Sequence, residues 1–132
     1  MPGFTLTAHA HAPVEEVWKL LHDPARFPEW WAGVDKVAPG PGGEYTMWPD
    51  GYPDFPMRQQ IAEDRAGGRV VISCLVSDLS FVWRLRADGD DTDIDVEVGI
   101  PDREAHRLPA QREMVSDSLA ALTALAEAFP AD

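Results

Sequence analysis

Cysteine, basic residues and long apolar runs are all scarce in this sequence of 132 residues. Cys74 is the only cysteine, so the chain can form no internal disulfide and has no cysteine cluster for zinc or an iron–sulfur centre. No uncharged apolar run approaches the roughly 20 residues that a bilayer-spanning helix needs. The sequence therefore predicts no membrane span.

The charge balance is strongly acidic, with 23 Asp and Glu against 11 Lys and Arg and a formal net charge of −12. Nucleic-acid binding depends on Lys and Arg that displace phosphate counterions, and docking on an anionic membrane needs the same positive charge. Both kinds of partner are therefore disfavoured. The first ten residues, MPGFTLTAHA, contain neither a basic segment nor an apolar one, so we expect no signal peptide and a cytoplasmic protein.

The first thirty residues predict one strand and two short helices. Residues 4–11 alternate between apolar and polar side chains, which is typical of a half-buried strand. Apolar residues at three- and four-residue spacing predict a helix over residues 13–22. Asp23 before Pro24 is typical of a helix start, because the carboxylate accepts free backbone N–H groups and proline fits the first turn.

The middle of the chain predicts antiparallel strands, because apolar and polar residues alternate between Gly-, Pro- and Asp-rich turns. A short strand is expected before the Pro- and Gly-rich segment 39–43, and further strands at 43–49, 55–63, 69–77, 80–87 and 92–100. In the last of these, Ile94, Val96 and Val98 alternate with acidic residues, so its apolar face is expected to be buried.

The longest predicted helix covers about residues 108–129. Its apolar stripe consists of Leu108, Val115, Leu119, Leu122, Ala126 and Phe129. A terminal helix of this kind is expected to lie on the apolar face of the sheet. We therefore predict an α+β fold in which residues 1–132 form a single domain. A curved antiparallel sheet of about seven strands wraps around the C-terminal helix and leaves a tapering space between them.

The opening of the chain contains Ala12-Pro13, Val17-Trp18, Leu21, Asp23-Pro24 and Phe27-Pro-Glu-Trp30. With these residues it resembles the opening of the helix-grip (SRPBCC) superfamily. The superfamily includes START lipid-transfer domains, the birch-pollen allergen and the polyketide cyclases, and the resemblance covers essentially the whole chain. It implies a helix-grip fold with a hydrophobic cavity between the sheet and the long helix, usually without a metal or a nucleotide.

Two branches of this superfamily look similar to the chain. One is the bacterial polyketide cyclase/dehydrase and lipid-transport group, whose members bind hydrophobic or polycyclic ligands. The other is the group of activators of a heat-shock-protein ATPase, suggested by Trp30-Trp31 and by Pro41-Gly-Gly43-Glu-Tyr45 before a strand. The sequence leaves both open.

Aromatic and methionine side chains dominate the positions that we expect to face the cavity. These positions are Trp30, Tyr45, Met47, Phe55, Met57, Gln59, Phe81, Trp83, Ile94, Val96, Met114 and Val115. A lining of this kind suits flat apolar ligands. The alternative is that the same side chains fill a solid core.

Few polar side chains are expected inside the cavity. Gln59 and Tyr45 could bind a polar group of the ligand, and Gln111 and Arg112 lie near the expected cavity mouth. Gln59 could equally be a buried amide bonded to the backbone. No inward strand position carries Asp, Glu, His or Lys, which argues against acid–base catalysis. A cyclase that works by positioning its substrate does not need such a group.

The histidines and the acidic run near the end of the sheet do not predict a metal site. His9 and His11 lie two residues apart on the outer strand face, close enough to share an ion, but no third ligand is apparent. The acidic residues of segment 88–95 lack the spacing of an EF-hand loop, so we expect them to form a solvated face. The sequence therefore predicts no metal and no other cofactor.

Binding of a small hydrophobic ligand, aromatic or polycyclic, is the function that the sequence favours. The first alternative is a polyketide aromatase/cyclase that uses Gln59, Tyr45 and Arg112 as polar guides. The second is an interaction module similar to the chaperone ATPase activators. A homodimer is compatible with each of these functions.

Overall fold

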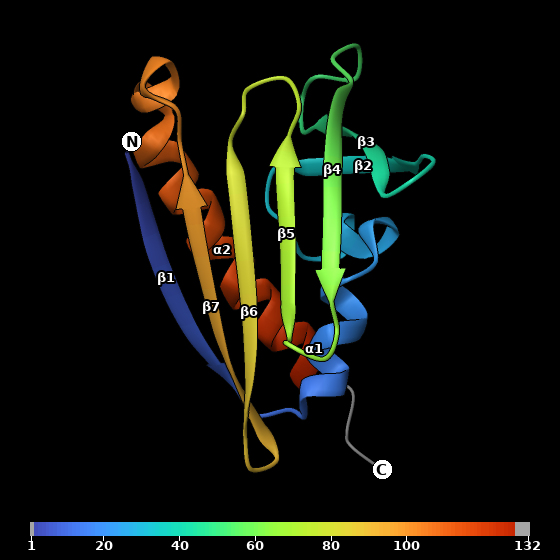
Figure 1. The fold of residues 1–132 in the computed structure, drawn as a ribbon, viewed down its shortest axis with the longest axis vertical. Helices are drawn as coiled ribbons and strands as arrows, with labels where there is room; N and C mark the ends of the chain where they lie inside the picture. The colour runs from blue at the N-terminus through green and yellow to red at the C-terminus, as the bar shows by residue number, and fades with distance from the viewer. Residues whose placement is uncertain (1, 129–132) are drawn as a thin grey trace.

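A seven-stranded antiparallel sheet wrapped around a long C-terminal helix forms the framework of the protein (Figure 1). The computed structural model describes residues 2–128. The strands are β1 (Gly3–Ala10), β2 (Val34–Pro39), β3 (Glu44–Pro49), β4 (Met57–Asp64), β5 (Arg69–Cys74), β6 (Ser80–Asp88) and β7 (Asp91–Gly99). Their order in the sheet is β1-β7-β6-β5-β4-β3-β2. The predicted helix-grip α+β fold is confirmed.

Four helical segments accompany the sheet. They are α1 (Val14–Leu21), the 3-10 helix η1 (Pro24–Glu29), the 3-10 helix η2 (Asp102–Arg107) and α2 (Leu108–Glu127). The main-chain N–H of Ala25 donates to Asp23 Oδ1 at 3.0 Å, so Asp23 caps η1 as predicted. In the part of the chain that the structure describes, no helix is long and apolar enough to cross a bilayer.

The core lies between the sheet and α2. Ile94, Val96 and Val98 on β7 are buried, as their alternation predicted. Val115 and Leu122 are buried on the facing side of α2, and Figure 1 shows this helix crossing one face of the sheet. Burial of these apolar surfaces makes the main contribution to the stability of α2 against the sheet. Phe129 of the predicted stripe lies outside the described residues.

Two predicted strands are shorter than expected. β4 begins at Met57 and not at residue 55, because Pro53 and Pro56 cannot supply the N–H groups that a strand ladder requires. β5 ends at Cys74 and not at residue 77, because the chain turns there through Asp78, whose φ is 62°. Both ends border the cavity described next.

Candidate functional site

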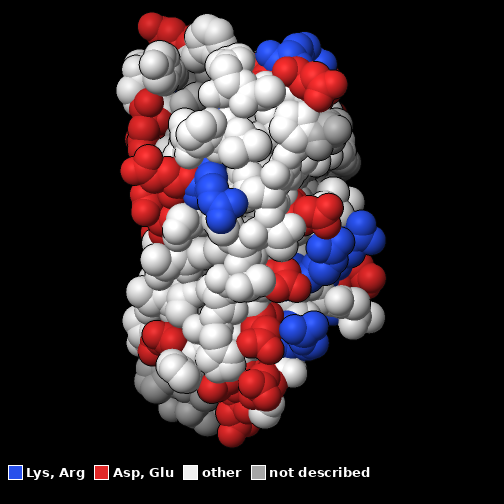
Figure 2. Space-filling view, turned by 90° about the vertical axis from the view of Figure 1, so that its left-hand side faces the viewer, with Lys and Arg blue, Asp and Glu red and all other residues white. Residues whose placement is uncertain are grey.

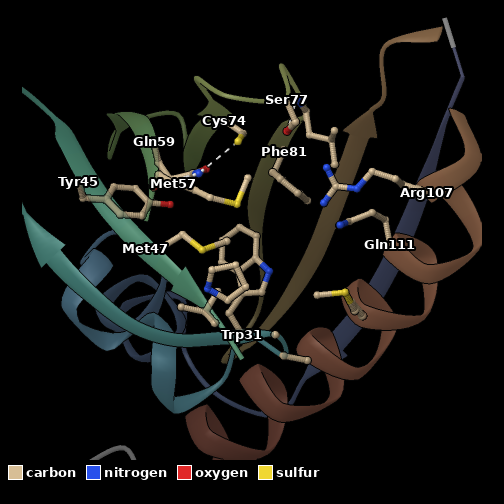
Figure 3. A pocket seen from close by; sticks show the side chains of 16 residues that line it. Trp31, Tyr45, Met47, Met57, Gln59, Cys74, Ser77, Phe81, Arg107 and Gln111 are labelled. Carbon is tan, nitrogen blue, oxygen red and sulfur yellow. Dashed lines mark hydrogen bonds between the residues drawn. The ribbon is translucent and has the colours of Figure 1, made fainter. Parts of the chain in front are cut away.

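A cavity of about 130 Å³ lies between the sheet and the N-terminal half of α2. Figure 3 shows its 16 lining residues. They are Trp31, Ala32, Gly33, Val34, Tyr45, Met47, Pro49, Met57, Gln59, Cys74, Ser77, Leu79, Phe81, Arg107, Gln111 and Met114. The space therefore exists where the curvature of the sheet around the helix predicted it.

Apolar side chains form most of the cavity wall. Trp31 follows η1 and meets Phe81 of β6 edge-to-face, with ring centroids 5.1 Å apart. Met47 and Met57 come from neighbouring strands and Met114 comes from α2. Thioethers are flexible and polarizable, so this wall can adapt to a flat apolar ligand.

A row of polar side chains crosses three strands on one side of the cavity. Tyr45 on β3 is the register partner of Gln59 on β4, and Gln59 is the partner of Cys74 on β5. The Gln59 side-chain amide donates to Cys74 Sγ at 3.3 Å (Figure 3). All three residues are buried, and burial raises the pKa of the Tyr45 phenol. Tyr45 therefore stays protonated and can donate a hydrogen bond.

Two polar side chains extend into the cavity from the helical side. Arg107 precedes α2 and Gln111 lies one turn later, and Figure 3 shows both directed toward the cavity from the side opposite Gln59. Arg107 Nη1 is 4.0 Å from a carboxylate oxygen of Glu104, which is too far for a hydrogen bond. Within the described part of the chain, the Arg107 guanidinium therefore has N–H groups free to bind an acceptor in the cavity.

Arg107 is also the one charged group among the lining residues of the described chain, which include no aspartate, glutamate or histidine. The cavity therefore offers neutral hydrogen-bonding groups and one cation, but no carboxylate or imidazole to act as a general base. An arrangement of this kind can hold and orient a ligand, and can polarise a carbonyl group near Arg107.

Six of the residues predicted to bind the ligand line the cavity: Tyr45, Met47, Met57, Gln59, Phe81 and Gln111. Met114, which was also expected to face it, lines it as well. These positions were predictable because strand alternation and the helix period decide which face they occupy.

Five other predicted residues lie elsewhere, and the first three are core or surface aromatics. Trp30 is buried in the core, and its Nε1 donates to the Leu20 carbonyl at 2.9 Å. Trp83 is buried against Trp30 and Trp31, with centroids 5.4 and 5.5 Å away. Phe55 precedes β4 in an irregular segment and its side chain is 61% exposed. None of these three rings lines the cavity.

The other two misplaced residues are on α2. Arg112 is exposed and its guanidinium lies 5.6 Å from the ring centroid of Phe4, outside the cavity. Val115 is fully buried in the core. The residues that line the cavity from this side are Arg107 at the end of η2 and Gln111 and Met114 on α2, spaced four and three residues apart.

Several lining residues were absent from the predicted binding set, namely Trp31, Cys74, Ser77, Leu79 and Arg107. Arg107 could have been found, since it lies one helical turn before Gln111. No sequence pattern could tell whether Trp30 or Trp31 lines the cavity. Both follow a 3-10 helix that ends at Glu29, so no helix or strand period assigns either residue to a face. Ser77 and Leu79 lie in the turn after β5, whose end the sequence placed too late.

Comparisons with known proteins agree with this fold. Residues 1–129 match the family described as polyketide cyclase / dehydrase and lipid transport. Among curated proteins, no sequence matches significantly. The match falls on one of the two branches that the opening of the chain resembles.

Several solved structures share the fold. The di-domain ARO/CYC BexL of the BE-7585A biosynthetic pathway superposes with a TM-score of 0.79 at 17% identity, over 96% of this chain and 47% of that one. The di-domain ARO/CYC StfQ of the steffimycin pathway gives 0.78 at 18%, over 94% and 44%. An uncharacterized protein from Bacillus thuringiensis gives 0.76 at 15%, over 97% and 100%.

The chain spans about half of each di-domain protein and the full length of the Bacillus one. At these identities, the similarity to solved structures concerns the fold. The family match, in contrast, covers residues 1–129 of the sequence. The chain therefore belongs to the polyketide cyclase/dehydrase and lipid transport family, within the SRPBCC superfamily.

Proposed function

We propose that the protein binds a small aromatic molecule in the cavity, with a carbonyl or carboxylate group of the ligand held at Arg107. The observation that carries this proposal is the contrast between an apolar wall and one charged group at the helical side. Ligand sites commonly combine an apolar lining with a few polar groups that fix orientation. Here the ring would lie against Trp31 and Phe81 while the acceptor meets the guanidinium.

The volume of the cavity limits the size of the ligand. An apolar cavity of about 150 Å³ in another protein accommodates benzene, and this cavity measures about 130 Å³. A space of this size suits one aromatic ring. A polycyclic ligand, which the sequence left open, would have to displace side chains such as Met47, Met57 or Met114.

A series of carboxylates of increasing size tests this proposal. Benzoate, naphthoate and anthracene-carboxylate are titrated into the protein by calorimetry, and the Trp31 indole signal is followed by NMR. We expect benzoate to bind and affinity to fall for the three-ring acid. No binding of any of the three up to about millimolar concentration, or binding without a change at Trp31, would overturn the proposal.

The role of Arg107 is tested with a matched pair of variants. Arg107→Gln removes the cation at the cavity, whereas Arg112→Gln removes an exposed cation from the first turns of α2. A hydrogen bond to a charged group contributes about 1.5–3 kcal/mol, so we expect roughly tenfold or greater loss of benzoate affinity only in Arg107→Gln. Equal affinities in the two variants would remove Arg107 from the proposed site.

A second candidate function is an aromatase/cyclase that acts by positioning its substrate. The row of neutral hydrogen-bonding groups at Tyr45, Gln59 and Cys74 favours it, together with the cyclase activity in the family description. Effective molarity alone can lower a barrier by several kcal/mol. Turnover of a poly-ketone substrate that falls in Gln59→Leu, with Gln60→Leu as the exposed-side control, would support this function. Benzoate binding without turnover would support a carrier.

A further inference from the structure

A second cluster of chemically active side chains lies at the other end of the sheet from the cavity, where β1 ends and the β6–β7 hairpin turns (Figure 1). His9 on β1 is the register partner of Asp93 on β7. His11 follows β1 directly, and Asp91 opens β7 after the hairpin turn. The tertiary structure thus brings a carboxylate beside the two histidines, which the sequence alone did not reveal.

The polar atoms of this cluster have the spacing of metal ligands. His9 Nε2 lies 3.0 Å from Asp91 Oδ2, and His11 Nδ1 lies 3.2 Å from the same oxygen. One ligand atom from each of these three residues lies within 4.8 Å of the others. Ligand atoms about 2.0–2.1 Å from a tetrahedral zinc ion are about 3.3 Å apart. The cluster therefore needs little rearrangement to surround an ion.

Neighbouring groups hold two of these ligands in place. Asp93 Oδ1 lies 2.7 Å from His9 Nδ1, so a proton on Nδ1 leaves the Nε2 lone pair directed at the cluster. A carboxylate that binds the far nitrogen of a ligating histidine is a common support of zinc sites. The His11 main-chain N–H donates to Glu127 Oε2 at 2.7 Å, which ties this segment to the end of α2.

Charge also favours a cation here. Asp88, Asp90, Asp91 and Asp93 all lie in or beside the hairpin of a chain with a net charge of −12. Figure 2, which faces the β1 edge, shows acidic side chains gathered at the lower end of the molecule. The field of such a group raises the local concentration of cations.

We propose that His9, His11 and Asp91 bind a divalent transition-metal ion such as zinc, with Asp93 orienting His9 and the remaining coordination position open to water. Two imidazoles and a carboxylate favour zinc, nickel or copper over calcium, which prefers an all-oxygen shell. The site is separate from the cavity and does not depend on the ligand proposed above.

Calorimetric titration of the full chain with zinc chloride, after removal of bound metal with a chelator, tests the site. Zinc binds the unprotonated form of imidazole, so it competes with protons for His9 and His11. Metal affinity is pH-dependent for this reason, and the titration is run at about pH 8. We expect one zinc ion per chain. No saturable binding would overturn the proposal.

Matched variants identify the ligands. The His11 side chain is 76% exposed and that of His106, which lies outside the cluster, is 74% exposed, so either can be changed without opening the core. We expect His11→Gln to weaken zinc binding at least about tenfold, and His106→Gln to leave it unchanged. Equal binding in these two variants would overturn the proposal.

Two further measurements separate a built site from general acidity. Calcium in place of zinc should bind at least about tenfold more weakly, because two of the ligands are nitrogens. Zinc should also raise the melting temperature of the unaltered chain and not that of His11→Gln, since an ion bound only to the folded state stabilises it. Calcium binding as tight as zinc, or an equal rise in both melting temperatures, would contradict the site.

Discussion

The hydroxyl of Ser118 on α2 accepts a hydrogen bond from the main-chain N–H of Ala32 at 2.9 Å. The same hydroxyl donates to the Met114 carbonyl at 2.7 Å, and the Ser118 residue is fully buried. This contact fixes the segment that carries Trp31 and Gly33, two residues of the cavity wall, against the helix that carries Met114. One buried hydroxyl therefore couples two sides of the cavity.

Ser118→Ala should destabilise the protein by about 1–3 kcal/mol, because it leaves the Ala32 N–H without its acceptor. Benzoate affinity should fall as well, since Trp31 loses its anchorage to α2. Urea unfolding measures the first effect and calorimetry the second. Ser116→Ala, an exposed serine on the same helix, is the control. Identical unfolding midpoints for the two variants would contradict the coupling.

Trp83→Ala should lower the free energy of unfolding by roughly 3–5 kcal/mol, because the indole is fully buried against Trp30 and Trp31. Trp83→Phe should cost less, since Trp83 Nε1 is buried without a hydrogen-bond partner among the described residues. Chemical denaturation of the two variants compares these costs. A larger loss in Trp83→Phe than in Trp83→Ala would contradict this order of costs.

Gly33→Ala tests how closely the cavity wall meets α2. Gly33 has φ of +89°, and a Cβ there would overlap Met114 Cε. Gly51 has a similar φ of +82° with no atom within 4 Å of a Cβ, so Gly51→Ala measures the backbone cost alone. Met114 Cε is the end of a flexible side chain beside the cavity and can shift, so we expect Gly33→Ala to be more destabilising than Gly51→Ala by a small amount only. In the double variant, Met114→Ala should abolish this difference. Equal melting temperatures for the two alanine variants would refute this.

The ion pair of Arg26 and Glu29 predicts a pH dependence for η1. Arg26 Nε and Nη2 lie 2.8 and 3.0 Å from the two oxygens of Glu29, and this contact lowers the pKa of the carboxyl below its usual 4.5. Because the pKa of Glu29 is lower in the folded chain than in the unfolded chain, its ionised carboxylate stabilises the fold at any pH above the unfolded-state pKa. This stabilisation is lost as the pH falls through the folded-state pKa.

Glu29→Gln should therefore reduce stability at neutral pH and lose that effect in acid. The Glu29 side chain is exposed and that of Arg26 is half-buried, so solvent screens the pair and the difference should stay below about 1 kcal/mol. Melting temperatures of the unaltered chain and of Glu29→Gln, measured across the acid range, give the profile. A difference that is constant with pH would assign the effect to something other than the charge of Glu29.

The predictions from sequence succeeded where side-chain period alone decides position. The alternation of Ile94, Val96 and Val98 on β7 and the placement of Met57 and Gln59 on the inner face of β4 followed from a period of two. The cap at Asp23 followed from local chemistry. They failed at the ends of elements, where Phe55 proved exposed and the turn containing Ser77 replaced the end of a strand.

The choice among neighbouring candidates was beyond the sequence. Trp30 and Trp31 are equally apolar, and only packing directs one to Leu20 and the other to the cavity. Likewise, a helix stripe shows that Val115 is buried but not which part of the sheet it meets. Residues far apart along the chain, such as His11 and Asp91, become neighbours only through strand pairing.

For this chain, the order of its residues determined the strands, the helices, the apolar faces and hence a sheet that closes on its last helix, because these depend on local periodicity and chain stiffness. Tertiary structure alone decided that the sheet leaves about 130 Å³ unfilled, that Arg107 is the charge beside it, and that two histidines meet an aspartate eighty residues away. Such outcomes depend on how non-local surfaces fit together, and no short stretch of sequence contains that information.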